Sequence, residues 1–141
     1  MVSITASAAA LAPGLLPYRT AIGHHIPMIM LSNATYTAYD PHNAAGWSHA
    51  IGTTLLRTEL GFTGVTITDS LDGTAKARGL WTRVLAVSAA RAGTDMILTT
   101  GSELSTSGVF ATLMRQAQEG LIPLSTLRTS YTRILALKAS L

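Results

Sequence analysis

The stretch "GVTITDSLDG", residues 64–73, joins an apolar, β-branched run to one carboxylate, Asp69, and three residues later to a second, Asp72. Val, Ile and Thr favour strands, and a near-continuous run of this kind is typical of a strand buried on both faces. We therefore predict a buried strand that ends on Asp69. A side chain at the end of such a strand is held by a rigid element.

Two further runs have the same character, "IPMIMLSN" at 26–33 and "TDMILTTG" at 94–101, and each ends in small polar residues. The runs are spaced by about 38 and about 31 residues, as expected of βαβ units with parallel strands. Apolar residues at helical spacing lie between and after them. The expected helices are a short one at 17–23, one ending at Gly61, one ending before Gly93 as a C-cap, one ending at Gly120, and a last one with Ser125 as N-cap.

This alternation predicts an α/β fold, either an open doubly wound sheet or part of a (β/α)8 TIM barrel. About three parallel strands with flanking helices cannot close a barrel, so the barrel would be partial. No Gly- or Pro-rich linker interrupts the chain, and residues 1–141 are expected to form a single partial domain. In both architectures function sits at the carboxyl ends of the strands.

Composition excludes several functional classes. Hydrophobic residues make up 48% and charged residues 12%, and the net charge of +3 comes from dispersed arginines, so we expect no nucleic-acid partner. Without cysteine there is no disulfide and no thiol catalysis. The histidines lack metal-ligand spacing, no nucleotide-binding loop is present, and we expect no metal and no cofactor. No membrane span or signal peptide is recognised, which makes a cytoplasmic location the default.

Two interpretations of Asp69 remain open from its chemistry alone. It is either a catalytic carboxylate at a strand end or an N-cap that accepts backbone N–H bonds from the following helix. Asp95 lies at the opposite, N-terminal end of its strand, so we expect a structural role for it.

Four segments carry a family resemblance: "MIMLSNATYTAYDP", "LLRTELGFTGVTITDSLD", "AVSAARAGTDMILTTG" and "SYTRILALKASL". In this order and spacing they resemble the N-terminal (β/α)8 domain of glycoside hydrolase family 3, most closely its bacterial β-N-acetylhexosaminidase branch. The resemblance covers the chain from about Leu15 to its end. The second segment is the most specific, because helix end, glycine pair, strand and carboxylate coincide there.

The resemblance implies that Asp69, preceded by Thr68, is the nucleophile of a retaining exo-β-glycosidase that works by double displacement. The implied substrates are carbohydrates with terminal β-linked N-acetylglucosamine or glucose, and the implied chemistry needs no metal or cofactor. Which residues bind the substrate cannot be assigned from this sequence.

The chain departs from the family pattern in one important respect. No residue matches the family's sugar-binding K-H-F-P-G-type segment or the D-x-H loop that supplies the acid/base, and the chain is expected to begin after both. Asp72 and Glu103 are the remaining candidates for the acid. We expect a C-terminal half of the barrel with little or no activity by itself.

Two alternatives to an enzyme fragment are a non-catalytic barrel remnant, which self-assembles into a homo-oligomer through its exposed sheet edge, and a small open-sheet binding protein. The second is disfavoured because no phosphate-cradling loop is present.

Overall fold

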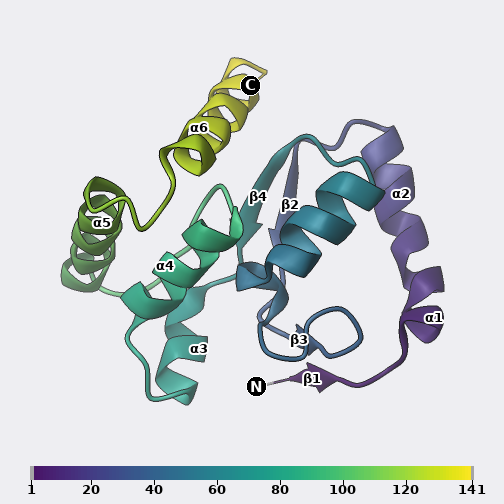
Figure 1. Cartoon of the computed structure of the whole chain (residues 1–141), viewed down its shortest axis with the longest axis horizontal. Helices are drawn as coiled ribbons and strands as arrows, with labels where there is room; N and C mark the ends of the chain where they lie inside the picture. The colour runs from purple at the N-terminus through teal and green to yellow at the C-terminus, as the bar shows by residue number, and fades with distance from the viewer. Residues whose placement is uncertain (1, 141) are drawn as a thin grey trace.

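Parallel pairing of two strands forms the centre of the structure, a computed structural model that describes residues 2–140. β2 (Met28–Leu31) and β4 (Val65–Thr68) pair with Met28 opposite Val65 and Leu31 opposite Thr68 (Figure 1). A single parallel bridge from Ile67 to Met96 extends the sheet on the other side of β4. The pairing follows the order of the chain, as in an arc of a (β/α)8 barrel.

Helices flank this arc, with α1 and α2 on one side of the strands and α5 and α6 on the other (Figure 1). Two short strands, β1 (Ser3–Ile4) and β3 (Thr35–Tyr36), form a separate parallel pair. No helix in residues 2–140 combines the length and apolar character needed to cross a membrane. The helices are α1 (Ala8–Leu11), η1 (Ala12–Leu15), α2 (Leu16–Gly23), η2 (Ala45–Trp47), η3 (Ala50–Glu59), α3 (Leu71–Ala77), α4 (Thr82–Ala92), α5 (Glu103–Gln118) and α6 (Leu124–Ala139).

The predicted α/β fold class is confirmed, and all the expected helices are present. Gly93 ends α4 in the left-handed region, with φ 92°, as the C-cap prediction requires. The prediction that Ser125 caps the last helix is wrong. α6 begins two residues earlier, at Leu124, with Pro123 at the N-cap and no side-chain cap. The short helix α3 was not predicted, because Gly73 in its interior weakens the helical pattern.

The third predicted strand, 94–101, is reduced to the bridge at Met96. Main-chain bonds join Met96 N to Thr66 O (2.9 Å) and Thr68 N to Met96 O (3.1 Å). On either side of Met96, backbone N–H groups donate to threonine side-chain hydroxyls and not to backbone carbonyls of β4. Asp95 N donates to Thr66 Oγ1 (3.1 Å) and Leu98 N donates to Thr68 Oγ1 (3.0 Å). These side-chain bonds occupy backbone N–H groups on both sides of Met96, and the pairing is confined to that one residue.

η3 is a π-helix, whereas the apolar spacing of about four had predicted an ordinary helix. The wider turn is visible at its end, where Leu60 N donates to Leu55 O, five residues back. Leu56 nevertheless packs on Ile29, Leu31 and Phe62, which are all buried. η3 therefore covers one face of β2.

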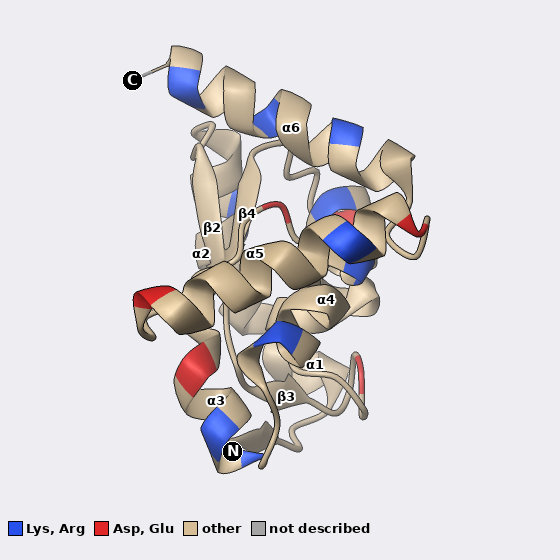
Figure 2. Cartoon of the chain, turned by 90° about the vertical axis from the view of Figure 1, so that its left-hand side faces the viewer, with Lys and Arg blue, Asp and Glu red and all other residues tan. Residues whose placement is uncertain are grey.

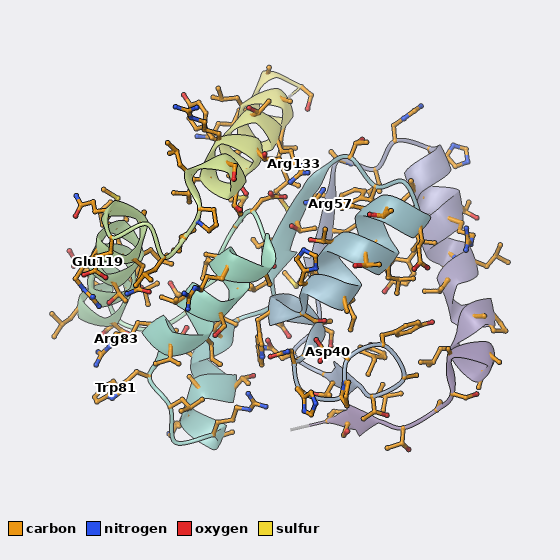
Figure 3. All side chains as sticks on the ribbon, viewed as in Figure 1. Asp40, Arg57, Trp81, Arg83, Glu119 and Arg133 are labelled. Carbon is orange, nitrogen blue, oxygen red and sulfur yellow. The ribbon has the colours of Figure 1, made fainter. Side chains whose placement is uncertain are left out.

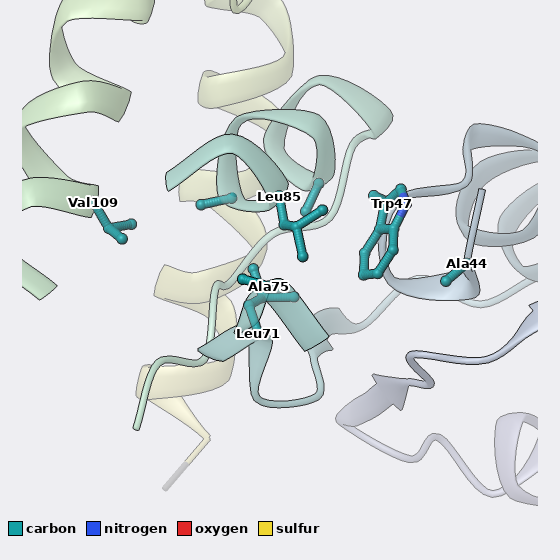
Figure 4. Close-up of a cluster of buried hydrophobic side chains, with 8 residues drawn as sticks. Ala44, Trp47, Leu71, Ala75, Leu85 and Val109 are labelled. Atoms are coloured by element: carbon teal, nitrogen blue, oxygen red, sulfur yellow. The ribbon is translucent and has the colours of Figure 1, made fainter. Parts of the chain in front are cut away.

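The larger hydrophobic cluster lies beneath the strand ends. Trp47 of η2, Leu71 and Ala75 of α3, and Leu85 of α4 are buried together, and Val109 of α5 joins them (Figure 4). Leu71 directly follows the Asp69–Ser70 turn and is fully buried. Its burial fixes the point at which the chain leaves β4.

Gly64 provides a test of the fold. A Cβ at this position would lie 2.5 Å from Pro27 O and 2.8 Å from the Phe62 ring, so Gly64→Ala forces apart the start of the β2–β4 pairing. Overpacking of this kind costs about 1–3 kcal/mol. Urea unfolding should show that loss.

Gly73→Ala is the matched control. Nothing lies within 4 Å of its added Cβ, and the helical position favours Ala by about 0.5–1 kcal/mol. Equal stability changes in the two variants would contradict the packing described for Gly64.

Candidate active site at the carboxyl ends of the strands

Asp69 directly follows β4 and is exposed, at the carboxyl end of the central strand pair. Its backbone N–H donates to Leu31 O (3.0 Å), so the strand pairing continues up to this residue. Its carboxylate Oδ1 accepts from Ser70 N (2.7 Å). Among the described residues Oδ2 has no hydrogen-bond partner. The carboxylate is thus anchored through its main chain and keeps one oxygen free.

The N-cap interpretation of Asp69 is wrong, because the residue at the N-cap of α3 is Ser70. Asp69 accepts a bond only from the Ser70 N–H ahead of the helix, and no side-chain cap bond reaches the helical N–H groups. The exposed carboxylate therefore has no helix-capping role.

Asn33 and Thr100 hold the turn that follows Asp69. Asn33 Nδ2 donates to Ser70 O (2.8 Å), and the hydroxyls of Ser70 and Thr100 are 2.8 Å apart. These contacts bring together the ends of all three predicted strands. Asn33 Oδ1 is buried and has no partner among the described residues. The sequence places these residues at the ends of the predicted strands but does not show which of them are in contact.

Asp72 has a structural role at the same edge. Its Oδ2 accepts from Thr100 N (2.6 Å) and its Oδ1 from Thr82 Oγ1 (3.1 Å). Gly101 fits closely beside it, since a Cβ there would lie 2.8 Å from Asp72 Oδ1. Both oxygens of Asp72 are occupied in joining α3 to the loop after Met96 and to α4.

Asp40, which the sequence did not single out, organises the loop after β3 (Figure 3). Its carboxylate accepts from Ser48 Oγ (2.7 Å) and from the backbone N–H groups of His42 and Asn43 (both 3.0 Å). Burial acts to raise the pKa of Asp40, but the hydrogen bonds from Ser48, His42 and Asn43 outweigh it and lower the pKa. The Asp-Pro pair at 40–41 is a typical turn signal that could have located this loop.

Asp95 is a buried ionic centre at the opposite end of the strands, as its predicted structural role requires. The side chain is 0% exposed. Oδ2 accepts from Arg57 (2.6 Å) and Thr66 N (2.9 Å), and Oδ1 accepts from Ser130 Oγ (2.8 Å) and Arg133 (3.0 Å). Burial acts to raise the pKa of Asp95, but these hydrogen bonds and the two guanidinium charges outweigh it and lower the pKa. η3, β4 and α6 all meet at this carboxylate.

In the part of the chain that the structure describes, no group of three or more His, Asp or Glu side chains is placed to hold a metal ion.

The fold and the site define a parallel α/β protein of the barrel class, with polar side chains gathered at the carboxyl ends of its strands. The model of the glycosyl hydrolase family 3 N terminal domain matches residues 9–137, and the chain belongs to this family. An uncharacterized secreted glycosyl hydrolase of Arthroderma benhamiae is 36% identical over 129 residues, which are 89% of this chain and 36% of that protein.

Solved structures agree with this assignment. A family 3 β-N-acetylglucosaminidase from Paenibacillus sp. is 29% identical, with a TM-score of 0.92 over 97% of this chain and 26% of that one. A β-N-acetylhexosaminidase from Beutenbergia cavernae is 26% identical, with a TM-score of 0.83 over 98% of this chain and 40% of that one. The chain therefore spans well under half the length of these relatives.

The ionic centre predicts a specific loss of stability in Asp95→Asn. Removing the charge leaves two guanidinium groups without their buried counter-ion, which costs about 3–5 kcal/mol. The lowered pKa means that the unfolded chain binds the proton more readily than the folded chain. The contribution is therefore fully present well above the unfolded carboxyl pKa of about 3.9 and is lost as the pH falls through the lower folded pKa.

Urea unfolding at pH 7 and at several values down to pH 3 measures this effect. The gap between the parent chain and Asp95→Asn should narrow toward acid. Glu119→Gln is the control, because the Arg115–Glu119 pair has side chains 59% and 44% exposed and such pairs contribute little. A constant gap across the pH range would be inconsistent with the assigned charge interaction.

Proposed function

We propose that this chain carries the nucleophile of a retaining exo-β-glycosidase of the β-N-acetylhexosaminidase type, with Asp69 in that role. The observation that supports it best is the free Oδ2 of an exposed carboxylate anchored at the carboxyl end of a barrel strand. Because Oδ2 accepts no bond from a protein donor that the structure describes, both of its lone pairs are available to a substrate. Membership of glycoside hydrolase family 3 implies a carbohydrate substrate.

In the proposed reaction, Asp69 Oδ2 attacks the anomeric carbon while the bond from that carbon to the leaving oxygen breaks. An acid protonates the leaving oxygen, and water then hydrolyses the glycosyl ester, so the configuration is retained. The likeness to a β-N-acetylglucosaminidase supports terminal β-linked N-acetylglucosamine as the first substrate to test, with glucose as the second.

We further propose that the chain by itself turns over little substrate. Double displacement needs a second carboxyl group about 5–5.5 Å from the nucleophile. Asp72 already accepts bonds on both oxygens, and Glu103 is an exposed residue in the first turn of α5. Without a general acid the rate falls by about 10²- to 10⁴-fold.

The choice of leaving group tests both parts of this proposal. The dinitrophenolate group of a dinitrophenyl β-N-acetylglucosaminide can leave without being protonated. The alkoxide of an alkyl glycoside can leave only when an acid protonates its oxygen. The parent chain should release dinitrophenol slowly, leave the alkyl glycoside intact, and accumulate a glycosyl ester on Asp69 that mass spectrometry locates. Asp69→Ala should abolish both release and labelling.

Asp72→Ala is the matched control, because it removes a neighbouring carboxylate that has a structural role. It should retain labelling at Asp69. Equal release by the parent chain and Asp69→Ala would remove Asp69 from the mechanism.

A second candidate function, self-assembly through the sheet, is supported by the environment of β2. Among the described strands β2 pairs with β4 alone, and Met30 in its centre is 53% exposed. A strand with an open edge and an apolar face is a template for pairing with another chain.

Light scattering after size exclusion should then show a dimer that Met30→Lys dissociates, because a charge on an edge strand opposes pairing. Met114→Lys is the control, since Met114 is similarly exposed, at 46%, but lies on α5. A parent chain that stays monomeric at high concentration excludes this second function.

A further inference from the structure

A polar cavity of about 290 Å³ lies between η3, the end of α4 and the first half of α6. We call it the arginine pocket and define it by Arg57, Arg91, Arg133, His49, Ser125 and Thr126. Figure 3 shows Arg57 and Arg133 approaching each other from η3 and α6. We propose that the arginine pocket binds a phosphate group, as inorganic phosphate or as a sugar phosphomonoester.

The charge of the pocket selects an anion. Three guanidinium groups line it, and none of its lining residues that the structure describes is acidic. Asp95 forms ion pairs with Arg57 and Arg133 and partly neutralises their charge, but it forms no ion pair with Arg91. α6 adds further basic residues and has no acidic residue along Leu124–Ala139 (Figure 2). An excess of positive charge at one cavity attracts anionic ligands.

Arg91 supplies the donors that are still free. Its Nε donates to Leu121 O (2.8 Å), which fixes the orientation of a guanidinium that lines the cavity. Both Nη groups lack a hydrogen-bond partner among the described residues. A guanidinium with two such N–H groups can hold two oxygens of a phosphate side by side.

Hydroxyl groups complete the set of ligands. Ser125 and Thr126 line the cavity from α6, and neither hydroxyl has a hydrogen-bond partner among the described residues. Hydroxyls can donate to an anion as well as accept. Donors from α4 and from α6 can bind different oxygens of a tetrahedral phosphate, whose four oxygens do not lie in one plane as those of a carboxylate do.

The size of the pocket leaves room beyond the phosphate itself. One water accounts for about 30 Å³ of liquid, so 290 Å³ exceeds the space of a bare oxyanion. Asp95, which holds two of the pocket's arginines, bonds to Thr66, three residues before Asp69. At about 3.3 Å per residue this places Thr66, and the ion pairs beneath the pocket, about 10 Å from Asp69 along the strand. The pocket is therefore separate from the proposed nucleophile.

Isothermal titration of the intact chain with sodium phosphate, at constant ionic strength in chloride, tests the proposal. We expect saturable binding of one phosphate, at least tenfold weaker in Arg91→Gln. Arg83→Gln is the matched control, because it removes the same charge from a residue stacked on Trp81 at 4.6 Å, outside the pocket. Thr126→Val, a smaller change, should also weaken binding and serves if Arg91→Gln fails to fold.

Two further arms identify the ligand and separate this site from the glycosidase proposal. If the pocket accepts a phosphomonoester, glucose 6-phosphate should compete with phosphate for binding, whereas glucose should not. If phosphate binds and glucose 6-phosphate does not compete, the site takes only the free anion. Asp69→Ala should bind phosphate like the parent chain. The absence of saturable binding, or equal weakening by Arg83→Gln and Arg91→Gln, would overturn the proposal and leave the role of Asp69 unaffected.

Discussion

The positions of η3, β4 and α6 relative to one another depend on the bonds that the buried carboxylate of Asp95 accepts. Within one side chain it joins Arg57 of η3, the Thr66 backbone of β4, and Ser130 and Arg133 of α6. These partners are distant in sequence, and charge-assisted hydrogen bonds are stronger than neutral ones. α6 lies across the strands at this end, and its position relative to β4 depends on these bonds more than on its half-exposed apolar side chains.

β4 connects the Asp95 end of the strands to the carboxyl end, where Asp69 lies, and it is hydrogen-bonded along its length. Thr66 is bonded to Asp95 by both its N–H and its hydroxyl, and Thr68, fully buried, accepts from Leu98 N. Asp69 follows immediately and is bonded through its backbone to Leu31. A side chain that projects from such a chain of fixed bonds is positioned by the whole sheet, which a flexible loop could not do.

The sequence could predict features that depend on local chemistry. The apolar runs around Ile29 and Ile67 predicted the two paired strands, and Gly93 predicted the end of α4. Features that depend on distant partners were missed. The threonine hydroxyls that confine the third strand act across about 30 residues, and the contact between Asn33 and the Ser70 carbonyl spans 37. The π-helical turn of η3 has no signature in a pattern of apolar spacing alone.

Asp69 and Asp95 show how two identical side chains differ in their surroundings within one sheet. Asp95 is enclosed by donors and cations that lower its pKa, so both of its oxygens are committed to structure. Asp69 has one donor, from its neighbour Ser70, and solvent on its other side. An oxygen that accepts no hydrogen bond from the protein keeps both of its lone pairs available, which suits the nucleophilic role proposed for Asp69. The sheet keeps the two carboxylates apart. Asp95 is buried at the start of the third predicted strand, and Asp69 is exposed at the end of β4.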